Sequence, residues 1–181
     1  MAYALMGRSY DGVGEAELAA QNITKAYELR DRVSEPENFF ITFNYDRQGP
    51  RNLELARQTL ASWTQRYPGD LEPHGFSAAF TSAGTGRYET AVEQGLKALE
   101  IDPKYSVGYG NVAFAYVYLD RPSEADALLR KASERKIEAI EFSLLRYFIA
   151  FLRKDDAAME RRWTNARRSY RLRDGSRTRK L

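Results

Sequence analysis

A period of about 34 residues runs through this chain and limits its fold more than any other feature of the sequence. Three segments align on an alanine, at Ala56, Ala91 and Ala125, so the same pattern returns after almost equal lengths of chain. Pro68 and Pro103 repeat at the same interval, and each follows its alanine at the same distance along the chain. Apolar or small residues follow every alanine at helical spacing, so the repeated unit is predicted to be helical.

The recurring small residues have a physical reason. Two helices approach to about 8–10 Å only where the facing side chains are small. Alanine therefore marks the point where the two helices of a pair cross, and proline marks the end of the second helix, because proline cannot continue a helix. The same template fits the N-terminus with Gly7 and Ala19, and a fifth copy fits with Ala158 in place of Ala125. No segment has the alternating pattern of a β-strand.

The sequence thus predicts an all-α protein, an α-solenoid of antiparallel helix pairs with about four and a half to five repeats. The predicted pairs are 2–11 and 15–32, 36–47 and 51–66, 72–84 and 88–100, 105–119 and 122–135, and 137–153 and 156–170. The corresponding repeats span approximately 1–33, 37–70, 72–105, 106–138 and 139–170. Residues 171–181 form a basic tail that is predicted to be disordered.

This pattern resembles the tetratricopeptide-repeat family across residues 1 to about 170. The resemblance implies that the α-solenoid is a right-handed superhelix. A narrower resemblance rests on residues 26–35, on Trp63 ahead of Tyr67 and Pro68, and on residues 150–153 with 158–160. These segments are similar to the repeat arrays of bacterial serine/threonine kinases and related signalling proteins. The Gly-rich loop and the HRD and DFG triplets of a kinase are missing from the sequence. The resemblance therefore implies a non-catalytic interaction module, an adaptor or regulatory segment in bacterial signalling.

The composition leaves little room for catalysis or for a cofactor. The chain contains no cysteine and one histidine, which excludes a thiol nucleophile, a Cys-ligated zinc and a multi-His metal site. We therefore expect no enzyme activity, no cofactor and no metal. His74 is interpreted as a repeat-boundary residue, Gly84 to Gly86 as an inter-helix turn, and Asp155 with Asp156 as a solvated helix start.

The concave face of the array is the candidate binding surface. In the family, the first helix of each pair lines this face, and the matching positions here carry aromatic side chains with few charges. We expect this groove to bind an apolar helix or an extended peptide. The alternative is that the protein's own segments fill it. The candidate groove residues are Ile41, Tyr45, Phe76, Phe80, Asn111, Phe114, Tyr118 and Tyr147.

The net charge of +3 conceals a strong asymmetry. Residues 161–181 carry nine basic side chains and one acid (9 − 1 = +8), and the rest of the chain carries 19 basic and 24 acidic ones (19 − 24 = −5). One interpretation is a solvated polar cap on the end of the solenoid. The alternative function is electrostatic binding of nucleic acid or an anionic surface. The candidates for that function are Arg161, Arg162, Arg167, Arg168, Arg171 and Arg173.

The expected partner is a protein or a peptide. Nucleic acid is not the expected partner, because no known nucleic-acid-binding fold is recognisable. Self-association is a further expectation, through an uncapped N-terminal repeat that carries Tyr3, Met6 and Tyr10. No apolar run approaches the roughly 20 residues of a membrane span. We expect a cytoplasmic location, with an extracytoplasmic one as the alternative.

Overall fold

The computed structural model describes residues 1–161 and 163–164, apart from the side chain of Ser82, and most of these residues lie in helices. No strand occurs within those residues. The chain divides into two compact units, Met1–Gly86 and Arg87–Leu181. Each unit has a hydrophobic core of its own.

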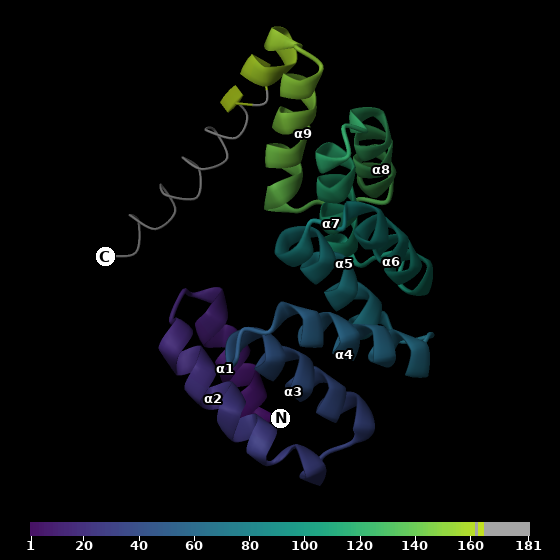
Figure 1. Ribbon diagram of the computed structural model, residues 1–181. Helices are drawn as coiled ribbons and strands as arrows, with labels where there is room; N and C mark the ends of the chain where they lie inside the picture. The colour runs from purple at the N-terminus through teal and green to yellow at the C-terminus, as the bar shows by residue number, and fades with distance from the viewer. Residues whose placement is uncertain (162, 165–181) are drawn as a thin grey trace, which may run out of the picture. The chain divides into compact units, whose positions relative to one another are not determined.

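The first unit contains five α-helices and one short 3₁₀ turn, and their arrangement can be followed in Figure 1. The helices are α1 (Ala2–Gly12), α2 (Ala16–Glu28), α3 (Glu35–Gln48), α4 (Leu53–Arg66) and α5 (Leu71–Thr85), and the 3₁₀ turn is Arg30–Arg32. Each α-helix packs on the next one in the chain, and α1 also contacts α3. Contacts between helices two places apart are what the stacking of helix pairs in a solenoid produces.

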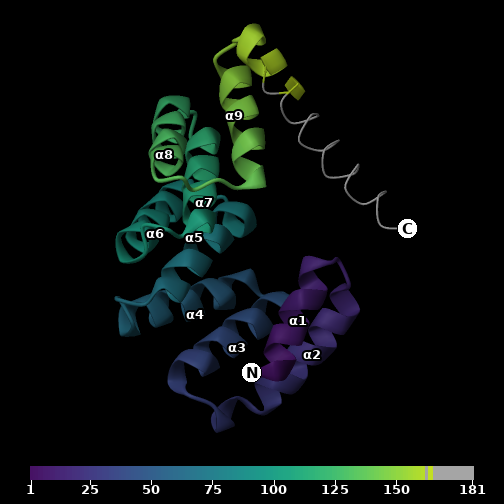
Figure 2. The same cartoon turned by 180° about the vertical axis from the view of Figure 1, so that it is seen from behind.

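The second unit repeats this arrangement (Figure 2). It contains α6 (Tyr88–Ile101), α7 (Ser106–Tyr118), α8 (Pro122–Glu134) and α9 (Ile140–Leu152), and helical residues 156–161 and 163–164 follow. Helix α7 contacts α6, α8 and α9. The all-α solenoid of helix pairs that the sequence predicts is therefore confirmed.

The small residues of the repeat lie at the helix crossings, as predicted. Ala19, Ala56, Ala91 and Ala125 are at most 1% exposed. A Cβ atom added to Gly7 would lie 3.1 Å from both the Ala19 carbonyl oxygen and the Ile23 amide nitrogen, so α1 and α2 touch backbone to backbone at this point. Large side chains such as Trp63 in the first unit and Tyr109 in the second fill the space between crossings.

Residues with a left-handed backbone conformation recur with the same period, and the sequence alone does not reveal them. Gly14, Arg51, Gly86, Asp120 and Lys154 all have φ between 54° and 83°, and they recur once per repeat. Each of the first four lies five places before one of the repeat alanines. A left-handed residue therefore reverses the chain before the second helix of every pair, although only two of the five are glycines.

This register corrects the position assigned to the fifth repeat. The residue five places after Lys154 is Met159, one place later than the predicted Ala158. The Met159 amide donates to the Asp155 carbonyl at 3.0 Å, as the Ala125 amide donates to the Arg121 carbonyl at 3.2 Å. Met159 is thus the structural counterpart of the alanine, and the larger side chain explains why this repeat is weak in the sequence.

Within the described residues, the helix boundaries agree with the sequence to within a few residues, except at the end of α2. The predicted end of the last helix, at residue 170, lies outside the described residues. The sequence predicts that this helix continues to residue 32, but it ends at Glu28. The Arg30 side chain donates to the Tyr27 carbonyl at 2.9 Å, and its guanidinium lies 3.9 Å from the centre of the Tyr27 ring. This contact satisfies a carbonyl at the helix end, and a 3₁₀ turn follows.

The division into two units falls after Gly86, between α5 and α6. The sequence places these two helices in one repeat, 72–105. The predicted tail, residues 171–181, lies outside the described residues.

Candidate functional site

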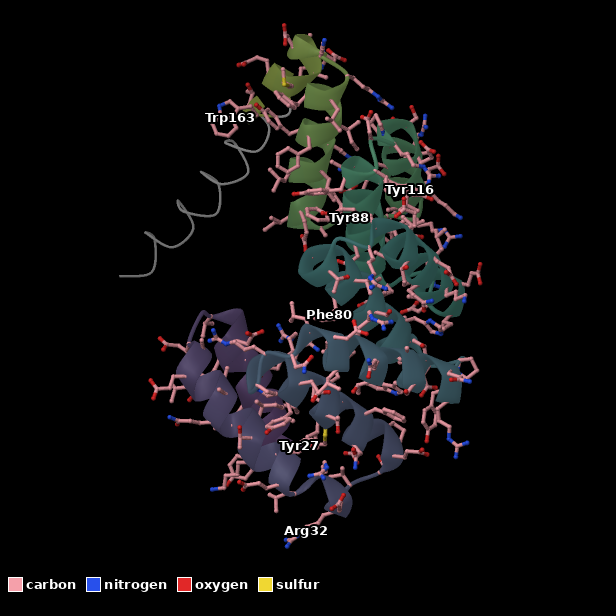
Figure 3. The ribbon with its side chains drawn as sticks, in the orientation of Figure 1. Tyr27, Arg32, Phe80, Tyr88, Tyr116 and Trp163 are labelled. Atoms are coloured by element: carbon pink, nitrogen blue, oxygen red, sulfur yellow. The ribbon has the colours of Figure 1, made fainter. Side chains whose placement is uncertain are left out.

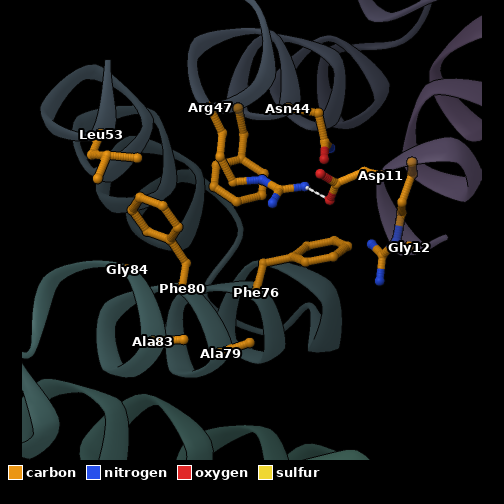
Figure 4. Close-up of a pocket in the computed structure, with 12 residues that line it drawn as sticks. Asp11, Gly12, Asn44, Arg47, Leu53, Phe76, Ala79, Phe80, Ala83 and Gly84 are labelled. Carbon is orange, nitrogen blue, oxygen red and sulfur yellow. Dashed lines mark hydrogen bonds and ion pairs between the residues drawn. The ribbon is translucent and has the colours of Figure 1, made fainter. Parts of the chain in front are cut away.

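An open pocket of about 530 Å³ lies in the first unit (Figure 4). Helices α1, α3 and α5 supply most of its lining, and the first residue of α4 completes it. The lining residues are Arg8, Asp11, Gly12, Phe43, Asn44, Arg47, Leu53, Phe76, Ala79, Phe80, Ala83 and Gly84. The volume is within the usual range of ligand pockets, roughly 300–1,000 Å³.

Three phenylalanine rings form the apolar part of the pocket. Phe43 contacts Phe76 at 5.7 Å between ring centroids and meets Phe80 edge-on at 5.5 Å. Behind them, Trp63 of α4 stacks on Phe76 at 6.0 Å and is 1% exposed. Phe80, which is labelled in Figure 3, is buried on α5, with 7% of its surface exposed. The rings are held by one another and by the core, so the apolar surface exists before a ligand arrives.

Charged side chains stand at the rim. Arg47 Nη2 lies 2.7 Å from Asp11 Oδ2, an ion pair that joins α3 to α1. The guanidinium of Arg8 lies 4.5 Å from the centre of the Phe76 ring. Arg8 is exposed and forms no ion pair within the described part of the chain. Since Asp11 already neutralises Arg47, Arg8 is the cation at this rim that a ligand can reach.

The predicted groove residues of this unit lie in three different settings. Phe76 and Phe80, which the sequence assigned to a concave groove, line this pocket. Tyr45 is half-buried and stacks on Tyr27 of α2 at 3.9 Å between centroids. Ile41 is 1% exposed and belongs to the core, because its side chain is enclosed in the same cluster as Ile23. Ile41 thus has no surface to offer a partner.

The predicted groove residues of the second unit lie on α7 and α9. Tyr118 is 57% exposed, stacks on Tyr88 at 4.9 Å and contacts Phe114 at 4.6 Å. Asn111 of α7 has a buried Nδ2 with no hydrogen-bond partner within the described residues. Tyr147 meets Phe148 edge-on at 6.4 Å on α9. No side chain of this group has a charge.

Similarity to known proteins is found in structure and not in sequence. No family model and no curated protein matches the chain. A tetratricopeptide repeat protein from Parabacteroides merdae matches 91% of this chain with a TM-score of 0.65 and 16% identity. A thermophilic protein of the same type from Thermus thermophilus matches 96% with a TM-score of 0.72 and 16% identity. The chain has the tetratricopeptide-repeat fold.

The two tetratricopeptide-repeat proteins differ in how much of them is matched. The chain spans 64% of the length of the Parabacteroides protein and 96% of the Thermus protein. No relationship to bacterial kinases emerges from either match, so that part of the expected resemblance stays a prediction.

Sequence reasoning missed the charged rim of the pocket. Within the tetratricopeptide-repeat pattern, Gly7 and Ala79 are equivalent small residues, so Arg8 is equivalent to Phe80. Applying the lining positions to the first repeat would have identified Arg8. No local signal identifies the contact of Asp11 with Arg47, because the two residues are far apart in the sequence.

The basic residues of the alternative function lie mostly beyond the described tetratricopeptide-repeat helices. Arg161 is exposed on the last helical segment. The other candidates fall outside the described residues, so binding through this segment stays a prediction. They are Arg162, Arg167, Arg168, Arg171 and Arg173.

The remaining candidates for chemistry have structural roles in this tetratricopeptide-repeat fold. His74 is 4% exposed, and its Nε2 lies 3.0 Å from the Pro68 carbonyl oxygen. Asp155 accepts a hydrogen bond from the Ala158 amide at 2.9 Å, as expected of a helix start. Residues 1–161 and 163–164 contain no group of three potential metal ligands and no helix long and apolar enough to cross a membrane.

Proposed function

We propose that this chain is a non-catalytic protein-interaction scaffold that binds a peptide or helix in the pocket between α1, α3 and α5. The observation that carries the proposal is the combination of a preformed cluster of three phenylalanine rings with a reachable cation, Arg8. An apolar cavity of this kind, with a small number of placed charges, is typical of a binding site.

The lining predicts the chemistry of the bound segment. An aliphatic or aromatic side chain would lie between Phe76 and Phe80, and burying it would contribute about 1.5–3 kcal/mol. Ala79, Ala83 and Gly84 leave room for that side chain along α5. A neighbouring carboxylate would lie beside Arg8. The ligand class is therefore a segment with a bulky apolar residue next to an acidic one.

Several finer expectations rest on the sequence alone. These are the role in bacterial signalling, the cytoplasmic location and self-association through the first repeat. Tyr3 and Met6 on α1 are 36% and 45% exposed, and Tyr10 is half-buried. These exposures are compatible with self-association through the first repeat.

The test uses two substitutions that leave the core in place. Ala83 is exposed on α5, so Ala83→Leu fills the pocket without displacing a buried side chain. Arg8→Glu reverses the charge at the rim. Ala61→Leu is the matched control, because Ala61 is also exposed but lies on α4 outside the pocket. Each full-length protein would be used to select peptides from a phage-displayed random library, after circular dichroism confirms folding.

The wild type and Ala61→Leu are expected to enrich the same peptides, with a bulky apolar residue beside an acid. Ala83→Leu should lose them, and Arg8→Glu should lose the preference for the acid. The proposal fails if the wild type enriches nothing, or if Ala83→Leu selects the same peptides as the wild type.

A further inference from the structure

Helix α9 carries an apolar stripe on its exposed side. Ile140, Leu144, Phe148 and Phe151 are 71%, 55%, 38% and 61% exposed. Their spacing of four, four and three places them along one face of the helix. Single exposed apolar residues are common on protein surfaces, but four in a row on one helix mark an interaction site.

The other side of α9 is already occupied. Phe142, Leu145 and Ile149 are buried in the core that α9 shares with α7 and α8. Among the described residues the opposite face stays exposed, and the chemistry at its two ends indicates which partner it fits.

The two ends of the stripe have opposite charges. Glu141 lies in the first turn of α9, and Lys154 lies just beyond its last residue. Both side chains are exposed, and neither forms an ion pair with a residue that the structure describes. The neighbouring Arg153, in contrast, already pairs with Asp126 at 3.5 Å.

One apolar pair of the stripe and the charged pair share one midpoint. Leu144 and Phe151 are centred between Tyr147 and Phe148, and so are Glu141 and Lys154. A face with this property is complementary to itself when a second copy is turned by half a revolution about an axis through the midpoint. Such a contact uses the same patch on both copies, so it produces a closed dimer and no longer chain of copies.

We propose that α9 of one copy pairs antiparallel with α9 of a second copy about a two-fold axis between Tyr147 and Phe148. In this register Leu144 of each copy lies opposite Phe151 of the other. Glu141 of each copy lies opposite Lys154 of the other, at both ends of the contact. Two copies joined in this way would present two pockets to a multivalent partner.

The primary test is the molar mass of the full chain in solution, measured by sedimentation over a wide range of protein concentration. The wild type is expected to reach twice the monomer mass of 20.8 kDa. Leu144→Glu and Phe151→Glu should each abolish the dimer, because they place a carboxylate in the apolar contact. Val107→Glu is the matched control, since Val107 is 48% exposed on α7 outside the stripe and gains the same charge.

A charge exchange tests the register. Glu141→Lys and Lys154→Glu should each weaken the dimer by placing like charges opposite each other, and the double variant should restore it. Lys154 already adopts φ 54°, so glutamate there adds no new backbone strain. Circular dichroism would confirm that every variant folds. A general loss of helix would lower the helical signal in the single variants and would not be restored by the exchange.

Four results would overturn the proposal. The wild type could stay monomeric at every concentration. The dimer could survive Leu144→Glu and Phe151→Glu, which would place the contact on another face. The charge exchange could fail to restore the dimer, which would refute the antiparallel register. The full chain could be monomeric while a variant ending at residue 164 dimerises, which would make the C-terminal segment of the same chain the occupant of the stripe.

Discussion

Gly7 and Gly12 on α1 offer a matched test of the argument that small residues are required at helix crossings. A Cβ atom on Gly7 would lie 3.1 Å from the Ala19 oxygen and the Ile23 nitrogen, and 3.3 Å from the Ile23 Cβ. A Cβ atom on Gly12 would have nothing within 4 Å. The substitution to alanine is chemically the same at both sites and lies in the same helix, so the difference isolates the crossing.

The magnitudes follow from two opposing effects. Replacing glycine by alanine within a helix contributes about 0.8–1.0 kcal/mol of stability. Overpacking costs about 1–3 kcal/mol, and at Gly7 two of the three close neighbours are backbone atoms that cannot rotate away. Gly7→Ala should therefore lower the free energy of unfolding by up to about 2 kcal/mol. Gly12→Ala should raise it by up to about 1 kcal/mol, and less if the helix end frays.

Thermal unfolding followed by circular dichroism measures both variants. In a chain of this size, about 1 kcal/mol corresponds to a shift in Tm of about 2–4 °C. We expect the Tm of Gly7→Ala below that of the wild type, and the Tm of Gly12→Ala at or above it. If Gly7→Ala is as stable as Gly12→Ala, α1 and α2 do not approach as closely as described, and the physical explanation of the repeat fails.

Two further predictions concern carboxylates of the first unit. Burial raises the pKa of Asp46 above its usual value of 3.8, although the hydrogen bond from Thr59 lowers it. The folded state therefore keeps the proton of Asp46 up to a higher pH than the unfolded state does. The stability of the protein falls as pH rises through this raised pKa. Asp46→Asn should raise Tm at neutral pH, with a gain that disappears in acid, and a gain that is independent of pH would contradict this cause. Ser34 donates its Oγ and its amide to Glu37 Oε2 at 2.7 and 2.9 Å, and these hydrogen bonds lower the pKa of Glu37. Ser34→Ala should lower Tm at neutral pH, because it removes the hydroxyl that donates to Glu37, and the loss should shrink as pH falls through the titration of Glu37. An unchanged Tm at neutral and at acidic pH would show that this hydrogen bond contributes nothing.

The helices and their crossings could be predicted because their causes are local. A small residue that recurs once per repeat, with apolar residues at helical spacing, fixes both the pairs and the faces that meet. The left-handed residues of the turns could not be predicted in the same way. Arg51, Asp120 and Lys154 occupy positions where the sequence offers no glycine. They are recognisable only once their spacing is compared with that of the alanines.

The pocket was predictable only in part, because it depends on convergence in space. Phe76 and Phe80 follow from the repeat positions, since both are on the inner face of one helix. The ion pair of Arg47 with Asp11 requires α1 and α3 to lie together, which periodicity does not specify. The burial of Ile41 has the same origin. Whether a lining position faces solvent or a neighbouring helix is decided by how closely successive pairs pack, and not by the residue itself.

The positions of the two tryptophans give the protein a built-in optical signal. Trp63 is 1% exposed and stacks on Phe76 of the pocket, whereas Trp163 is 56% exposed. A water-soluble quencher would remove the emission of Trp163 and leave that of Trp63. The remaining emission comes from an indole one ring away from the pocket. Occupation of the pocket would therefore change the fluorescence of the unlabelled protein, and a Trp163→Phe variant would report ligand binding by itself.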